Sequence, residues 1–244
     1  MTEHYRTQGF VLKKDDLGEA DQVFSIFTKD FGKLKITAKA VRKIKSKLRA
    51  GIGLFYLSEV EFIQGKAHKT LTDAITIEKF KNIRGDLEKL EIVNKIAETA
   101  DDLIKGEEKD EQIWELLSEV FYRLGVWKLK IENSIKIENC KLKIIYYYFL
   151  WNLLSILGYQ IDLYHCAKCQ RSLAPSKLYF NLGEGGIVCE KCFEGAGDKE
   201  ISPEVIKILR LFLKKDWQIL SRLRITDSLG KELESISKSA IINI

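Results

Sequence analysis

The sequence predicts an α+β protein in which a small barrel of five strands precedes an all-α bundle that carries a zinc-binding insertion. Three observations predict it. Apolar and polar residues alternate in short runs up to residue 78; apolar residues recur at helical spacing from residue 86; and two C-x-x-C pairs interrupt the helical part. The predicted domains are 1–78 for the barrel, 79–160 with 200–244 for the helices, and 161–199 for the insertion.

The barrel is predicted from five short runs with strand character. These runs span residues 9–12, 23–27, 33–39, 55–63 and 70–77. The third run alternates strictly, so that Leu34, Ile36 and Ala38 face inward and the intervening lysines face outward. A long polar connection follows it, and Gln64-Gly65-Lys66 forms a hairpin turn before the last run. This pattern favours the five-stranded OB barrel, a fold whose exposed face binds single strands.

The helical part is predicted from apolar residues at 3.6-residue spacing. Helices are expected over 86–105, 111–124, 138–157 and 226–242, with a further one beginning at Ser202-Pro203-Glu204. Gly125 and Gly158 are expected to end two of them. The aromatic run from Tyr146 to Phe149 suits core packing better than base stacking, since consecutive helical residues point in different directions.

Four of the five cysteines form two C-x-x-C pairs, Cys166 with Cys169 and Cys189 with Cys192. Two such turns place four thiolates around one Zn²⁺, which leaves no open coordination position and indicates a structural site. The alternatives are two disulfides, which need an oxidising compartment, and a redox motif, which usually has one pair. Lys168, with two more basic residues nearby, would offset the charge of the thiolates. We assign no role to Cys140.

Positive charge is concentrated between Phe31 and Ser58, where the sequence contains no aspartate or glutamate. The basic residues of this stretch are Lys33, Lys35, Lys39, Arg42, Lys43, Lys45, Lys47 and Arg49. Such runs usually form solvated loops. Here the run lies on and after a strand of a predicted OB barrel, so we expect it to follow the phosphates of a nucleic acid.

Several functional classes have no support in the sequence. There is no phosphate-binding loop of the G-x-x-x-x-G-K-[ST] type, no G-x-S-x-G and no H-E-x-x-H. With only three histidines, options for acid–base catalysis are few. The most apolar run, residues 144–157, is too short to span a bilayer, and the N-terminus lacks the apolar segment of a signal peptide. We therefore expect a cytoplasmic protein that is not an enzyme and does not contact a membrane.

The order and spacing of many short motifs resemble the RecO family of bacterial recombination mediators. The motifs that carry the resemblance are T-Q-G-F-V-L, L-G-E-A-D-Q-V, T-K-D-F-G-K, A-K-A-V-R-K, L-S-E-V-E-F, I-R-G-D-L-E-K-L, L-G-Y-Q-I-D-L-Y-H-C-A-K-C, G-G-I-V-C-E-K-C and I-S-P-E. Two residues depart from the family pattern. Ala40 stands where a glycine is expected, and Ile161 stands where a proline is expected.

The resemblance implies a role in DNA repair and homologous recombination. A member of this family binds and anneals single-stranded DNA, with double-stranded DNA left open as a ligand. It acts with a RecR-type protein, contacts the acidic C-terminal tail of single-strand-binding protein, and helps to load recombinase at the bacterial nucleoid. Two other hypotheses remain at this point: a zinc-containing adaptor for RNA or protein, and an enzyme of nucleic-acid metabolism.

Overall fold

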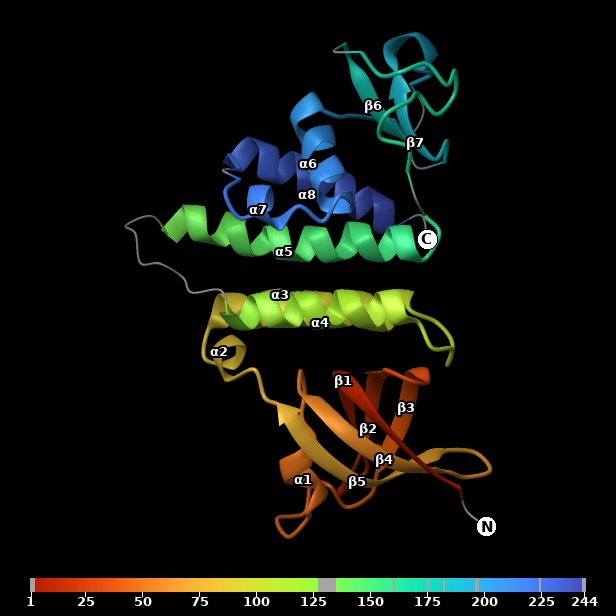
Figure 1. Cartoon of the computed structure of the whole chain (residues 1–244), viewed down its shortest axis with the longest axis vertical. Helices are drawn as coiled ribbons and strands as arrows, with labels where there is room; N and C mark the ends of the chain where they lie inside the picture. Colours follow the sequence, from red (N-terminus) through yellow and green to blue (C-terminus); the bar gives the residue numbers. More distant parts are fainter. Residues whose placement is uncertain are drawn as a thin grey trace. The chain divides into compact units, whose positions relative to one another are not determined.

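The computed structural model describes residues 3–126, 135–159, 161–174, 176–181, 183–195, 198–223 and 225–242, without the side chains of 135–141 and 242. The chain divides into two compact units, Met1–Trp127 and Lys128–Ile244 (Figure 1). No helix among the described residues is both long enough and apolar enough to cross a membrane.

The first unit contains a closed five-stranded barrel, as the alternation predicts. Its strands are β1 (His4–Leu17), β2 (Asp21–Thr28), β3 (Gly32–Ala38), β4 (Leu57–Gln64) and β5 (Lys69–Glu78). They follow the order β1-β2-β3-β5-β4, and β1 closes the barrel by pairing with both β2 and β4. The pairing of β3 with β5 is parallel, and the other strand pairs are antiparallel. This arrangement confirms the OB-like barrel.

The predicted inward residues fill the barrel. Leu34 is 1% exposed and Ile36 is fully buried, while Val60 and Phe62 on β4 are 0% and 2% exposed. The first strand is longer than the run of residues 9–12 that predicts it. Its second half, Lys13 to Leu17, has no apolar alternation but pairs with β2 as far as Asp21, after a register shift between Val11 and Lys13. Backbone pairing, rather than side-chain burial, holds this part extended.

A short helix, α1 (Leu48–Gly51), interrupts the predicted polar connection between β3 and β4. It lies against β5 so closely that a Cβ on Gly51 would approach the carbonyl oxygen of Ala74 to 1.7 Å. Only a glycine fits this contact. The helix escapes prediction because a single turn is too short to show helical periodicity.

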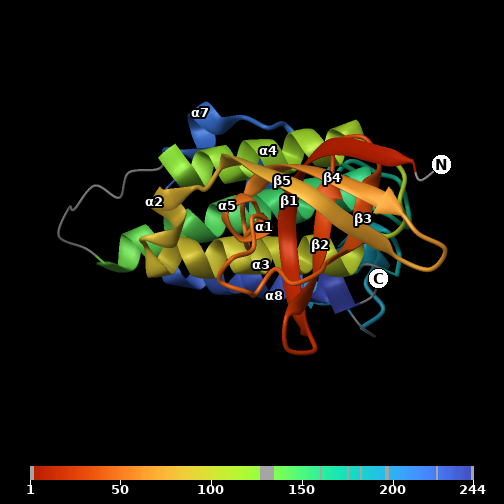
Figure 2. The same cartoon turned by 90° about the horizontal axis from the view of Figure 1, so that it is seen from below.

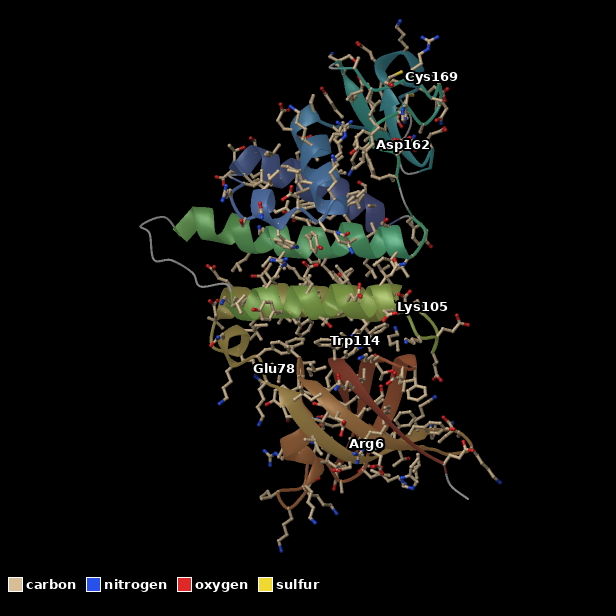
Figure 3. All side chains as sticks on the ribbon, viewed as in Figure 1. Arg6, Glu78, Lys105, Trp114, Asp162 and Cys169 are labelled. Carbon is tan, nitrogen blue, oxygen red and sulfur yellow. The ribbon has the colours of Figure 1, made fainter. Side chains whose placement is uncertain are left out.

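Three helices complete the first unit: α2 (Lys81–Arg84), α3 (Leu87–Leu103) and α4 (Glu111–Val126). Figures 1 and 2 show α3 and α4 running alongside each other across the barrel. The ring of Phe10 on β1 lies 5.1 Å from Trp114 and 4.9 Å from Phe121, both on α4. Trp114 points toward the strands in Figure 3. Gly125 does not end α4, which continues to Val126.

The first compact unit therefore extends past the barrel, whose last strand ends at Glu78, and includes α2 to α4. Residues 79–126 share an apolar core with the barrel, whereas the sequence pattern placed them with the later helices. The physical reason is that Phe10 lies outside the barrel core and needs an apolar partner, which α4 supplies. Helical spacing identifies an apolar face but does not reveal which surface covers it.

The second unit is built on α5 (Ile135–Ile156), with α6 (Pro203–Leu213), α7 (Trp217–Leu220) and α8 (Asp227–Ile242). The aromatic run of α5 is core, as expected: Tyr148 and Phe149 are fully buried. Helix α6 begins as its sequence predicts. The hydroxyl of Ser202 accepts a hydrogen bond from the backbone N–H of Val205 at 3.3 Å, and Pro203 occupies the first turn.

The backbone at residue 40 explains why a glycine suits the position that Ala40 occupies. Its φ is +54°, in the left-handed region that glycine adopts without strain, and its N–H donates to Asp21 Oδ1 at 2.7 Å. We expect Ala40→Gly to stabilise the protein by about 0.5–1 kcal/mol, because relief of the Cβ contact exceeds the added flexibility of the unfolded chain. Urea denaturation measures this change.

A matched control is Ala38→Gly, two residues earlier on β3. Ala38 is fully buried and lies in regular strand, so its replacement should lower the denaturation midpoint. If Ala40→Gly also lowers the midpoint, the left-handed turn is not strained by alanine.

Candidate metal centre and nucleic-acid interface

The four predicted ligands lie in a lobe of the second unit built on a small sheet. Its strands β6 (Leu178–Asn181), β7 (Gly186–Cys189) and β8 (Lys199–Glu200) follow the order β7-β6-β8. Cys189 ends β7, and the 3-10 turn η1 (Glu190–Cys192) carries Cys192. The first cysteine pair, Cys166 and Cys169, lies beside β7 because the N–H of Ala167 donates to the carbonyl of Ile187 at 2.8 Å. Figure 3 labels Cys169 in this lobe.

The tertiary structure brings the four thiols together. Their Sγ atoms all lie within 4.8 Å of one another, and those of Cys169 and Cys189 are 3.9 Å apart. Four metal–sulfur bonds of about 2.3 Å in a tetrahedron place the sulfurs about 3.8 Å apart. All four cysteines are free. The arrangement thus fits one tetrahedral metal ion rather than two disulfides.

The electrostatics of the cluster also suit a cation. Burial opposes ionisation of Cys166, but the backbone N–H groups of Cys169, Cys189 and Lys168 outweigh it and lower the pKa of this thiol to about 6. Hydrogen bonds with Cys189 and Cys169, together with burial and the charge of Cys166, raise the pKa of Cys192 to about 12. Without a metal the Cys192 thiol therefore stays protonated, whereas a divalent cation would favour its thiolate and release the proton.

Two residues beside the cysteines have other partners. The Lys168 ammonium lies 3.3 Å from Glu184 and 2.8 Å from Glu194, so these carboxylates share the charge that was expected to offset the thiolates. His165 directs its Nδ1 to Asp162 Oδ2 at 3.0 Å. This histidine is therefore engaged on the neighbouring carboxylate.

Most of the predicted basic residues are exposed on the barrel unit. Lys35 lies on the outward face of β3, and Lys39 follows its end. The connection between β3 and β4 carries the exposed residues Arg42, Lys43, Lys45, Lys47 and Arg49. Among the described residues, Lys35, Lys39, Lys43, Lys45 and Lys47 make no ion pair within 4 Å.

Lys33 is different, and we leave it out of the interface. Its side chain is 11% exposed and its Nζ lies 3.5 Å from Asp101 Oδ1 on α3, whose backbone carbonyl it also contacts. Burial lowers the pKa of Lys33, and Asp101 opposes that effect. Alternation correctly places this lysine on the outside of the barrel. Helix α3, however, covers that part of the outside.

Arg42 has a structural contact in addition to its exposure. Its guanidinium lies 3.2 Å from Asp16 Oδ2 and donates to the carbonyl of Gly18 at 3.3 Å. These contacts fasten the connection after β3 to the turn between β1 and β2. Part of its charge is therefore balanced by Asp16.

A cavity of about 500 Å³ brings further basic residues to this region. Lys14, Arg42, Arg49 and Arg84 line it together with Tyr56. Lys14 and Arg84 lie outside the acid-free stretch, and sequence reasoning missed them. No local charge run could have identified them, because only barrel closure and α2 bring them to Arg49.

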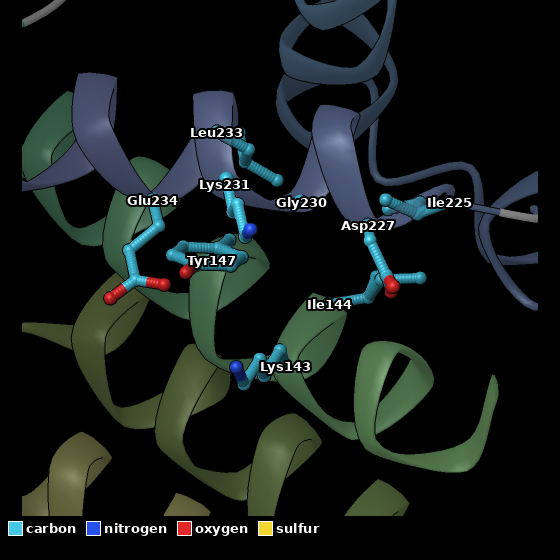
Figure 4. A pocket seen from close by; sticks show the side chains of 9 residues that line it. All are labelled: Lys143, Ile144, Tyr147, Ile225, Asp227, Gly230, Lys231, Leu233 and Glu234. Carbon is cyan, nitrogen blue, oxygen red and sulfur yellow. The ribbon is translucent and has the colours of Figure 1, made fainter. Parts of the chain in front are cut away.

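The second unit contains a cavity of a different kind, about 140 Å³ in volume, between α5 and α8 (Figure 4). Ile144, Tyr147 and Leu233 give it largely apolar walls. Its charged lining residues include both lysines and carboxylates. It therefore lacks the one-signed field of the cavity in the barrel unit.

Comparison with known proteins identifies the family. The model for the N-terminal domain of recombination protein O matches residues 1–80, and the model for its C-terminal domain matches residues 84–241. The chain belongs to the RecO family. The matches include the barrel and all four clustered cysteines, so the family assignment covers both parts of the candidate site.

Proteins named DNA repair protein RecO are similar over nearly the whole chain. One from Dehalococcoides mccartyi is 33% identical over 230 residues, covering 94% of this chain and 86% of the relative. Another from Acetivibrio thermocellus is 30% identical, covering 96% and 89%. A third from Thermoanaerobacter sp. is 29% identical, covering 95% and 88%. The chain is thus similar to these DNA repair proteins along both units.

Proposed function

We propose that this RecO-family protein binds single-stranded DNA on its barrel unit and anneals complementary strands. The exposed basic residues that follow β3 carry this proposal, since they have no acidic neighbours in sequence and belong to an OB-like barrel. Such residues neutralise phosphates without reading bases, so binding should tolerate any sequence and weaken with salt. Annealing by contacts alone needs no turnover of a nucleotide, which agrees with a mediator rather than an enzyme.

The metal proposed for the cysteine cluster is Zn²⁺. Four thiolates at tetrahedral spacing are the donor set of structural zinc sites, and they leave no position for a substrate. Cys166, Cys169, Cys189 and Cys192 would hold the ion and so fasten the turn before Gln170 to the edge of β7. The role of the ion is to stabilise the lobe.

The family supplies the proposed biological setting. By similarity to DNA repair proteins, we place the protein in homologous recombination at the bacterial nucleoid, where it would help load recombinase on strands coated by single-strand-binding protein. A RecR-type protein and the acidic tail of single-strand-binding protein are the proposed protein partners. The proposal places neither docking site.

A strand-annealing assay without ATP or Mg²⁺ tests the central function. One oligonucleotide carries a donor dye and its complement carries an acceptor dye. The two strands should pair faster when the protein is present. The acceleration should fall as salt rises, because the phosphate contacts are electrostatic. Annealing that proceeds at the uncatalysed rate, with no binding to either strand, would instead favour an adaptor for RNA or protein.

A further inference from the structure

The cavity in the barrel unit has a composition that needs explanation. We call it the basic cavity and define it by Lys14 on β1, Arg42 after β3, Arg49 on α1, Arg84 on α2 and Tyr56 before β4. Four cationic side chains from four separate segments thus surround a space of about 500 Å³. Converging like charges repel one another and lower stability, unless a ligand of opposite charge is bound.

Most of this charge has no acidic partner. Arg42 pairs with Asp16 at 3.2 Å. Within the part of the chain that the structure describes, Lys14, Arg49 and Arg84 lie in no ion pair of 4 Å or less. The cavity therefore presents a net positive field even after its internal pairing is counted.

Arg84 is held in place before any ligand binds. Its guanidinium lies over the ring of Tyr56, 5.0 Å from the centroid, and donates to the carbonyl of Leu54 at 3.3 Å. Lys79 adds a second cation 5.5 Å from the centroid of the same ring. The ring itself packs on Gly53, where an added Cβ would lie 3.1 Å from it. A guanidinium fixed on an aromatic face loses little entropy when it binds an anion.

We infer that the basic cavity holds a phosphodiester of the bound single strand and fixes one nucleotide in the barrel unit. The inference rests on the proposed function and gives it a defined anchoring point, whereas the exposed lysines of the connecting loop only follow the backbone. Arginine presents a planar pair of N–H donors that match two phosphate oxygens. The tyrosine–arginine stack at its wall is the kind of platform on which a base can lie.

An acidic peptide is the competing ligand class, and the cavity suits it less well. The apolar residues that line it, Phe24, Val41 and Ile52, are 1%, 3% and 4% exposed. They offer almost no surface on which the apolar side chains of a peptide could be buried. A nucleotide needs only charge, hydrogen-bond donors and a flat stacking surface, all of which the cavity has.

The test compares two double variants that each remove two positive charges. The cavity variant combines Arg49→Gln with Arg84→Gln. The control, Lys29→Gln with Lys66→Gln, removes two exposed lysines from the β2–β3 and β4–β5 turns, neither of which lines the basic cavity. Binding of a fluorescent oligothymidylate to the full chain is measured by anisotropy at several salt concentrations.

We expect the cavity variant to bind the oligothymidylate at least about tenfold more weakly than the control variant, which is the loss of about one charge-assisted contact. Without DNA, a variant that keeps Arg84 should melt no lower than the parent, because repulsion within the cavity is relieved. Lys14→Gln with Arg49→Gln gives an independent measurement, because it leaves Arg84 on its contacts with Tyr56 and Leu54.

The outcomes separate this inference from the function on which it rests. If the parent protein binds no oligothymidylate, the proposed function fails. If the parent binds but both cavity variants match the control variant, the cavity is not the anchoring point, while the proposed function stands. If polyglutamate of equal charge displaces the oligothymidylate as well as unlabelled oligothymidylate does, and this depends on Arg84, the cavity takes acidic peptides and the inference is wrong.

Discussion

Replacing Lys39, Lys43, Lys45 and Lys47 together with glutamine should flatten the salt dependence of single-stranded DNA binding and suppress annealing. Each contact between a lysine and a phosphate contributes about −0.7 to the slope of log affinity against log salt on single strands. Four contacts give a slope of about −2.8, which corresponds to an affinity loss of about 50-fold between 50 and 200 mM salt. The variant should lose that dependence.

These four lysines are chosen because the structure leaves them exposed. Arg42 is kept because its contacts with Asp16 and Gly18 hold two segments together. Its loss could weaken DNA binding by destabilising the fold, and that effect would be mistaken for a lost phosphate contact. Lys33 is kept because it pairs with Asp101. The variant Lys29→Gln with Lys66→Gln serves again as a charge control. If the quadruple variant retains the parental slope, single-stranded DNA does not bind along this loop.

The second large effect is expected at the metal centre. Cys189→Ser should lower the zinc content of purified protein from about one equivalent to nearly none, because structural zinc sites need all four ligands. The free energy of binding, about 10–16 kcal/mol in zinc-finger peptides, stabilises the fold around the ion. Its loss should expose residues 161–195 to proteolysis, while the barrel unit keeps its resistance.

Two measurements accompany this variant, zinc by atomic spectroscopy and mass spectrometry of the proteolytic fragments. Cys140→Ser is the matched control, with the same chemical change on α5; the side chain of Cys140 lies outside the described residues. It should leave the zinc content unchanged. Parent protein that contains no metal and has four freely reactive thiols at positions 166, 169, 189 and 192 would rule out the zinc site.

The sequence alone determined the features that depend on local pattern. Strict alternation in β3 and β4 identified which side chains enter the barrel, and Leu34, Ile36, Val60 and Phe62 are buried there. The spacing of the two cysteine pairs predicted the four thiols that lie together and could hold a metal ion, because each tight turn presents both of its sulfurs. Ser202 and Pro203 marked the start of α6 for a reason that lies within one helical turn.

Only the tertiary structure decided what covers each of these surfaces. Alternation placed Lys33 outside the barrel, but α3 lies over it and turns a predicted phosphate contact into an ion pair with Asp101. Phe10 packs against Phe121 on α4, so a helix expected in another domain shares an apolar core with the barrel. Lys14 and Arg84 reach the cavity beside Arg49 through barrel closure and the position of α2. Periodicity specifies the direction of a side chain from its own backbone, whereas burial and charge pairing depend on segments distant in sequence.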